Sequence, residues 1–106
     1  FLYVDDMAKA SVHLMNLDKK NYDKYIPIRC SHINVGSEKD LTIKELAETI
    51  KEVIGFKGKI DFDHSKPDGM RRKLLDSKLI NNLGYKPQTS LKEGLIKTYK
   101  DYIKVK

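Results

Sequence analysis

The sequence is poor in the residues that build disulfides and metal centres. Cys30 is the single cysteine among 106 residues, and the three histidines are scattered along the chain. One cysteine cannot close an internal disulfide, and no histidine stands at zinc-site spacing from it. We therefore expect no metal site, and a reducing cytoplasm is the default compartment.

Long apolar runs are lacking as well. No run approaches the ~20 residues that a membrane-spanning helix needs. The segment that begins at Phe1 has no charged stretch followed by an apolar one, which is the pattern of a signal peptide. The sequence therefore predicts neither a membrane partner nor a signal peptide.

The motifs of common catalytic and nucleotide-binding loops do not occur. The sequence contains no G-x-x-x-x-G-K-[ST], no G-x-G-x-x-G and no G-x-S-x-G. The acid pairs Asp5–Asp6 and Asp61–Asp63 lack the third partner that acid–base catalysis would need. On its own residues the chain is not expected to be a complete enzyme, and we assign it no catalytic, cofactor-binding or metal-binding residue.

The charge that is present has an excess of one sign. Lysine and arginine number 21 against 15 acidic residues, a net charge of +6. Such an excess favours anionic partners, which include nucleotides, nucleic acid and acidic lipid. The tyrosines and phenylalanines fall mostly on apolar stripes, where core roles explain them. A basic nucleic-acid-binding module is therefore an alternative that the aromatic pattern does not favour.

Hydrophobic periodicity predicts an α/β chain in the order strand, helix, strand, helix, strand, helix, helix. Capping boxes are expected at Thr42–Glu45 and Ser90–Glu93, and Gly55 and Gly84 are expected to end helices. The region 18–25 reads as a loop or a frayed helix end. The expected strands are 1–4, 31–36 and 56–63, and the expected helices are 7–16, 42–54, one that Asp76 caps, and one that begins at Ser90.

A cationic turn over residues 65–76 carries the strongest functional signal. Pro67 fixes its own φ and Gly69 permits a positive φ, so residues 66–69 are expected to form a tight turn. Arg72 and Lys73 are candidate phosphate ligands, and Asp68 is a candidate acceptor for the hydroxyl pair of a sugar or ribose. The alternative, a solvated basic loop before a helix, stays open on residue chemistry alone.

Seven segments together are typical of one known superfamily: FLYVDDMA (1–8), HINVG (32–36), TIKELA (42–47), SKPDG (65–69), RKLLD (72–76), LGYKP (83–87) and LKEGL (91–95). They resemble the extended short-chain dehydrogenase/reductases that act on nucleotide sugars. Within that superfamily, the loop at 65–76 resembles the GDP-L-fucose synthases.

The resemblance implies an NADP-dependent enzyme that converts GDP-4-keto-6-deoxy-mannose to GDP-L-fucose by epimerisation and reduction. Its glycine-rich cofactor loop and its catalytic Ser, Tyr, Lys, Cys and His would all lie upstream of Phe1. Cys30 does not match the context of the catalytic cysteine. Lys73 corresponds to a contact of the nucleotide diphosphate, Asp68 to a position near the GDP-sugar, and Arg72 is carried over with them.

The same resemblance divides the chain into two parts. Residues 1–36 would be the terminal strands and helix of an incomplete NAD(P)-binding Rossmann domain, and residues 37–106 a substrate-binding domain. The chain would be a C-terminal fragment that is inactive alone and binds no cofactor by itself. The full-length enzyme is expected to be a homodimer, and the fragment is expected to be marginally stable or to self-associate.

One departure keeps a second specificity open. The family usually reads Thr-Pro where this chain has Met70-Arg71. Loss of that proline loosens the turn, and Arg71 adds a charge. A fragment of another NAD(P)-dependent nucleotide-sugar epimerase or dehydratase is therefore the alternative within the same superfamily.

Overall fold

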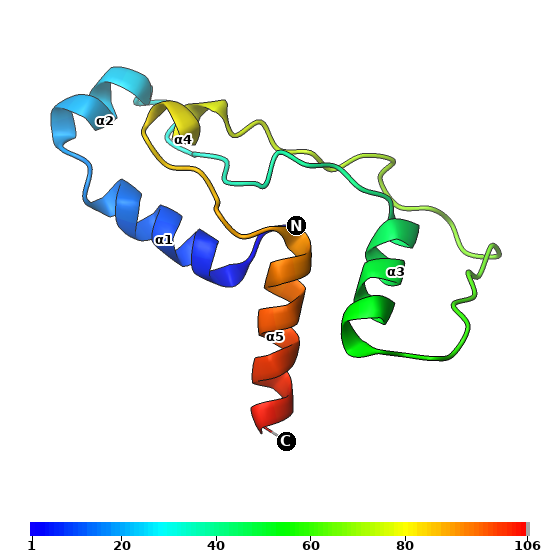
Figure 1. Ribbon diagram of the computed structural model, residues 1–106. Helices are drawn as coiled ribbons and strands as arrows, with labels where there is room; N and C mark the ends of the chain where they lie inside the picture. The colour runs from blue at the N-terminus through cyan, green and yellow to red at the C-terminus, as the bar shows by residue number, and fades with distance from the viewer. Residues whose placement is uncertain (106) are drawn as a thin grey trace. The chain divides into compact units, whose positions relative to one another are not determined.

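The computed structural model describes residues 1–105, and within that range all regular secondary structure is α-helical (Figure 1). The five helices are α1 (Val4–Met15), α2 (Lys19–Tyr25), α3 (Ile43–Ile54), α4 (Lys78–Asn82) and α5 (Leu91–Val105). Lys106, which the sequence placed at the end of the last helix, lies outside the described residues.

The three strands expected at 1–4, 31–36 and 56–63 are wrong for the described chain. Val4 opens α1, and the other two segments have no regular secondary structure. A strand exists only where a neighbouring strand supplies the ladder of backbone hydrogen bonds, and no described segment supplies one here. The alternating apolar residues of these segments favour a strand, but a sheet forms only when a second strand pairs with them.

The first helix begins earlier than its apolar pattern indicated. The carbonyl of Tyr3 accepts the N–H groups of Asp6 at 3.1 Å and Met7 at 3.2 Å, which draws the expected strand residues into the helix start. Asp5 and Asp6 therefore occupy the first turn of α1, where negative charge complements the helix dipole.

The short helix α2 resolves the open interpretation of residues 18–25. The Asp18 side chain accepts the N–H of Asn21 at 2.9 Å and caps the helix N-terminus. Lys19 and Asp23 form an i,i+4 ion pair on its exposed face. Local hydrogen bonds thus favour a helix in a segment that shows no apolar stripe.

Both predicted capping boxes are confirmed. At α3, the N–H of Glu45 donates to Thr42 Oγ1 at 3.1 Å, while Thr42 N–H donates to Glu45 Oε2 at 2.6 Å. At α5, Ser90 N–H donates to Glu93 Oε2 at 2.9 Å, and Glu93 N–H donates to Ser90 Oγ at 3.3 Å. Each box satisfies two of the N–H groups that a helix start leaves unpaired.

Glycine ends the helices where the sequence predicted. Gly55 follows α3 with φ of 70°, and Gly84 follows α4 with φ of 92°. Both values lie in the left-handed region that glycine enters without steric cost. The predicted cap of α4 is one residue off, because Ser77 is the N-cap while Asp76 accepts the N–H of Lys78 at 3.0 Å.

The chain divides into two compact units. The first joins Phe1–Glu38 with Leu74–Thr89, and the second joins Lys39–Lys73 with the segment that begins at Ser90. The chain therefore passes between the units three times, so neither unit is a single continuous segment. The assignment of residues 1–36 to a Rossmann domain and 37–106 to a substrate-binding domain stays a prediction.

The first unit is organised around a buried carboxylate. Asp6 is fully buried, and its two oxygens accept the backbone N–H groups of Gln88 at 3.3 Å and Thr89 at 2.9 Å. Its carbonyl accepts the Tyr85 hydroxyl at 2.6 Å. The buried apolar side chains of this unit are Ala10, Ile26, Ile80 and Leu83.

Two opposing effects set the charge state of Asp6. Burial opposes ionisation, but hydrogen bonds from the backbone and side chain of Thr89 and from the backbone of Gln88 favour it. The charge of Lys9 acts in the same direction. Together these favourable contacts hold the pKa of Asp6 below its ordinary value, so the buried group is a carboxylate at neutral pH.

In the same unit, residues 31–36 pass close to the segment before α4 (Figure 1). A Cβ on Gly36 would lie 3.3 Å from the Cβ of Leu75, and the Ser77 hydroxyl lies 3.4 Å from the Gly36 carbonyl oxygen. The two segments thus approach closely at Gly36, where a side chain would crowd Leu75.

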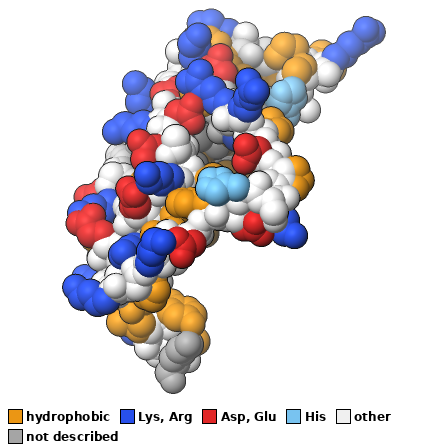
Figure 2. All heavy atoms as spheres, turned by 90° about the vertical axis from the view of Figure 1, so that its right-hand side faces the viewer, with side chains coloured by type: hydrophobic (Ala, Val, Ile, Leu, Met, Phe, Trp, Pro, Cys, Tyr) orange, Lys and Arg blue, Asp and Glu red, His pale blue; other side chains and the backbone are white. Residues whose placement is uncertain are grey.

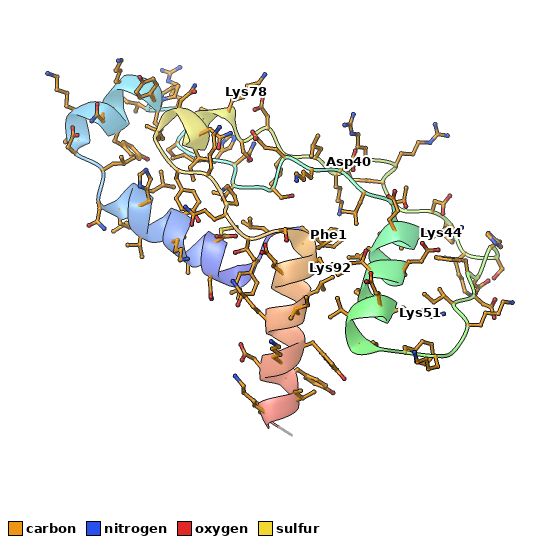
Figure 3. The ribbon with its side chains drawn as sticks, viewed as in Figure 1. Phe1, Asp40, Lys44, Lys51, Lys78 and Lys92 are labelled. Carbon is orange, nitrogen blue, oxygen red and sulfur yellow. The ribbon has the colours of Figure 1, made fainter. Side chains whose placement is uncertain are left out.

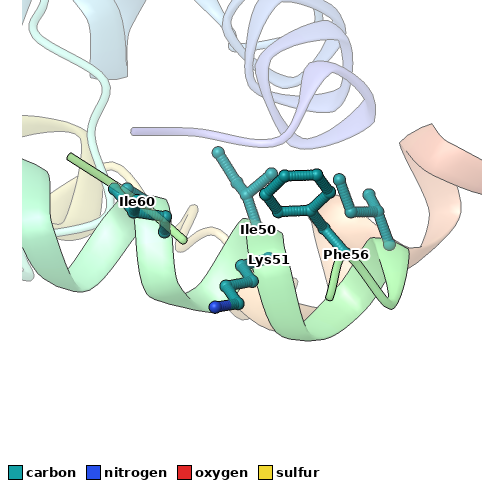
Figure 4. Close-up of a pocket in the computed structure, with 6 residues that line it drawn as sticks. Ile50, Lys51, Phe56 and Ile60 are labelled. Atoms are coloured by element: carbon teal, nitrogen blue, oxygen red, sulfur yellow. The ribbon is translucent and has the colours of Figure 1, made fainter. Parts of the chain in front are cut away.

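In the second unit, α3 and α5 lie in contact. Lys92 on α5, labelled in Figure 3, donates to Glu52 on α3 at 2.6 Å. The apolar stripe of α3 continues into a shallow depression (Figure 4), where the ammonium of Lys51 points away from the ring of Phe56. Its lining residues are Ala47, Ile50, Lys51, Ile54, Phe56 and Ile60.

Candidate anion-binding site

The cationic segment singled out by sequence forms an exposed loop. Residues 61–76 are all exposed and contain no helix. The loop leaves the α3 side of the second unit and runs to Lys73, where the chain passes into the first unit at Leu74. An exposed irregular loop between packed elements is the usual setting for ligand-contacting side chains.

The turn in this loop lies three residues earlier than predicted. The N–H of Lys66 points to the carbonyl of Asp63 at 3.4 Å, and the Asp63 carboxylate accepts the N–H of Ser65 at 2.9 Å and its hydroxyl at 2.6 Å. These bonds, led by the Ser65 hydroxyl, lower the pKa of Asp63. The side chain of Asp63, which accepts both bonds from Ser65, therefore sets the position of the turn.

The predicted tight turn at residues 66–69 is accordingly wrong. Among described residues the glycines with positive φ are Gly55 and Gly84, so Gly69 does not use the left-handed conformation expected of it. Pro67 has no N–H with which to close a turn of its own. It serves instead as a stiff residue directly after the Asp63 turn.

Arg72 is the one predicted site residue that the structure ties to another element. Its Nε donates to Asp40 Oδ2 at 2.5 Å, across 32 residues of sequence. The Arg72 side chain stays 67% exposed and that of Asp40 41% exposed, so the pair is open to solvent. Figure 3 labels Asp40 on the connector that leads into α3.

Lys73 and Asp68 are exposed without such a tether. Within residues 1–105, the structure gives neither side chain a hydrogen bond or an ion pair, and nothing joins Asp68 to Arg72 or Lys73. The three predicted residues thus share one loop. Arg72 and Lys73 are adjacent in sequence, but no described contact joins Asp68 to either of them.

Sequence reasoning missed Asp40. It stands in a polar turn segment, where an acidic residue carries no periodic signal of its own. Its one cue is its position two residues before the N-cap Thr42, which fixes where it sits relative to α3. No sequence rule pairs it with an arginine 32 residues later.

The loop presents cations of the kind that bind phosphate oxygens. It offers the guanidinium of Arg72, the free ammonium of Lys73 and the neighbouring Arg71, all suited to phosphate oxygens. Cys30, at 3.5 Å from His32 Nδ1, lies in the other unit on an exposed connector. No cluster of three potential metal ligands occurs in the described part of the chain.

Comparison with known proteins places this loop in context. No protein-family model matches the chain. A probable GDP-L-fucose synthase from Oryza sativa subsp. japonica is 52% identical over 103 residues, which are 97% of this chain and 29% of that protein. This chain is related to the GDP-L-fucose synthases. It spans between 29% and 32% of the length of the five such relatives at 44–52% identity.

Solved structures agree with the sequence comparison. A GDP-6-OMe-4-keto-L-xylo-heptose reductase from Campylobacter jejuni matches 96% of this chain with a TM-score of 0.83 and 34% identity, over 30% of its own chain. A GDP-mannoheptose C4 reductase from Campylobacter jejuni, solved with NADP bound, matches 93% of this chain and 29% of its own, with a TM-score of 0.75 and 33% identity.

These likenesses confirm the predicted relationship and fold class. The chain has the fold of one part of GDP-sugar reductases of the Rossmann type, and an NADP site is established for such a relative rather than for these residues. The strands that define α/β architecture are not formed by residues 1–105. No described helix has both the length and the apolar character to cross a membrane.

Proposed function

We propose that residues 1–106 form the C-terminal, substrate-binding portion of a GDP-L-fucose synthase-type epimerase/reductase, and that the loop 63–76 holds the diphosphate of a GDP-sugar. Lys73 contacts the diphosphate, Arg72 adds a second cation, and Asp68 faces a hydroxyl pair of the sugar. The observation that carries the proposal is Lys73, an exposed cation without an internal partner beside a tethered arginine, in a chain 52% identical to a probable GDP-L-fucose synthase.

Physical chemistry supports this choice of ligand. A charge-assisted hydrogen bond between a cation and phosphate contributes about 1.5–3 kcal/mol when formed, and exposure to solvent reduces that value. The two adjacent cations match the two charged groups of a diphosphate better than they match a ligand with a single carboxylate. The chain alone is expected to bind a GDP-sugar weakly and to turn none over, with NADP held elsewhere in the complete enzyme.

The test is an equilibrium titration of GDP against three proteins. Lys73→Ala is expected to weaken GDP binding about tenfold relative to the wild type. Lys100→Ala removes the same charge from the exposed side of α5 and is the matched control, which should stay close to wild type. Equal affinities for wild type and Lys73→Ala would reject the assignment of Lys73.

A related specificity is the second candidate, and Met70 favours it. Its side chain is 71% exposed within the cationic loop, at a position where the family usually has threonine. The solved relatives act on several different GDP-sugars, according to their descriptions. Competition among GDP-sugars that differ only in the sugar would separate the two candidates, since both are expected to prefer GDP and they differ in the sugar that they accept.

A small basic nucleic-acid-binding module is the alternative from another class. Such a module gathers its cations on one face with aromatic side chains between them, whereas basic and acidic side chains are interspersed on the face that Figure 2 draws. We propose accordingly that the anionic partner is a nucleotide sugar. We also propose a cytoplasmic location and a homodimeric full-length enzyme, which a fractionation and a sedimentation measurement would test.

A further inference from the structure

Asp40 lies close to the entrance of α3. It lies two residues before Thr42, whose hydroxyl and backbone N–H are both engaged in the capping box with Glu45. The helix cap therefore fixes the backbone two residues after Asp40. In Figure 3 the labelled Asp40 lies on the connector immediately before α3.

The contact with Arg72 uses one edge of the guanidinium. Asp40 Oδ2 accepts from Nε, and no other described acceptor is given to the Arg72 side chain. A guanidinium carries five N–H donors in one plane, four of them on the two Nη atoms. The Asp40 contact therefore orients the plane and leaves the Nη donors for a second partner.

We propose that Asp40 is the positioning residue of the anion site: it holds the guanidinium of Arg72 from its Nε side so that the Nη donors face a diphosphate beside Lys73. This inference rests on the proposed function and adds a residue to that site. An exposed arginine otherwise loses most of its rotamer freedom on binding. Orientation in advance by the Asp40 carboxylate reduces that loss.

A different role for Asp40 predicts the opposite sign. If the carboxylate competed with the phosphate for Arg72, or merely added negative charge to the site, its removal would strengthen anion binding. If Asp40 positions Arg72, its removal weakens binding although the net charge becomes more positive. The sign of the change in GDP affinity therefore separates positioning from competition.

The experiment titrates GDP into the 106-residue chain and three variants at one ionic strength. Asp40→Ala removes the acceptor, and Asp40→Glu restores it on a longer side chain. Asp61→Ala is the matched control, because Asp61 is an exposed acid of the same unit that pairs with Lys59 at 2.8 Å and not with Arg72. Circular dichroism of each variant verifies that the helices are retained.

We expect Asp40→Ala to weaken GDP binding about two- to fivefold, the range of an exposed ion pair. Asp61→Ala should leave it unchanged or slightly stronger, and Asp40→Glu should recover most of the loss. Unchanged or tighter binding by Asp40→Ala would overturn the proposal, as would an equal loss in Asp61→Ala.

A second readout does not depend on the ligand. In the wild type, the Arg72 Nε–Hε resonance should report a carboxylate partner, and Asp40→Ala should move it to the position of a solvated arginine while Asp40→Glu retains it. A resonance unaffected by Asp40→Ala overturns the positioning role whatever GDP does.

GDP titration of two further variants, Lys73→Ala and Arg72→Gln, separates failure of this inference from failure of the proposed function. If Lys73→Ala and Arg72→Gln bind GDP like the wild type, the anion site itself is rejected, and the positioning role is rejected with it. If those variants lose affinity while Asp40→Ala does not, the site stands and only the role of Asp40 is overturned.

Discussion

The backbone N–H of Thr89 donates to the carboxylate of the fully buried Asp6 at 2.9 Å, linking the first turn of α1 to residues 83 positions later. The same carboxylate accepts the N–H of Gln88. This pair fixes the segment just before the capping box of α5. It is the most heavily bonded buried polar group of the first unit.

Removal of this carboxylate should destabilise the first unit. Asp6→Ala removes the acceptor of the Gln88 and Thr89 N–H groups at a part-buried contact, and we expect a loss of about 1.5–3 kcal/mol in the free energy of unfolding. Asp5→Ala is the matched control, since Asp5 is exposed and contributes only through the helix dipole, about 0.5 kcal/mol. Urea unfolding followed by circular dichroism measures both, and equal losses would contradict the account.

The pKa of Asp6 predicts an acid-dependent loss of stability. Hydrogen bonds outweigh burial and hold the pKa of the folded-state group below 3.8, its ordinary value. The unfolded state therefore binds the proton first, so the stabilisation is complete above pH 3.8 and is lost as the pH falls below it. Protection of the Thr89 N–H against hydrogen exchange should therefore decrease as the pH falls through that range. A pH-independent protection of Thr89 down to pH 2 would refute this.

Two glycines should respond oppositely to alanine. Gly55 has a φ of 70°, so Gly55→Ala should destabilise α3 by about 1–2 kcal/mol. Gly69 lacks a positive φ and has open space around it, so Gly69→Ala should be neutral or stabilise by about 0.4–1 kcal/mol through the unfolded state. Thermal unfolding of the two variants compares them directly, and a large loss for Gly69→Ala would restore the turn predicted from sequence.

Exposed apolar side chains should cause self-association of the isolated chain. Met15 on α1 is 85% exposed and Ile28 is fully exposed. Apolar surface of this kind favours contacts between copies. Sedimentation velocity should show association that rises with concentration and weakens in Met15→Lys. A monomer at every concentration, with a sharp concentration-independent melting transition, would reject the prediction.

Local signals in the sequence predicted the helices well. The boxes Thr42–Glu45 and Ser90–Glu93 act within four residues, and Gly55 acts on its own backbone, so pattern and structure coincide there. The turn predicted at 66–69 was wrong because the Asp63 side chain accepts two hydrogen bonds from Ser65 and places the turn before Pro67. Where two turn signals are adjacent, the hydrogen bonds formed in the folded chain determine which one makes the turn, and the sequence alone does not show which bonds form.

Long-range relationships were beyond the sequence. The strands at 1–4, 31–36 and 56–63 depend on partners that no described segment supplies, and the pairs Asp6–Thr89 and Asp40–Arg72 join residues 83 and 32 positions apart. Of the candidate site, the cations Arg72 and Lys73 were found from their charge and context. Asp40 could be found only once the chain was folded.

The loop 63–76 as a diphosphate site is the central claim, and amide chemical-shift mapping with GDP tests it most directly. We predict that GDP added to the 15N-labelled chain shifts the amides of residues 64–76, Pro67 excepted, and of Asp40. Lys73→Ala should abolish most of these shifts at the same GDP concentration. Shifts confined to residues other than this loop and Asp40, or shifts that are identical in wild type and Lys73→Ala, would contradict the claim.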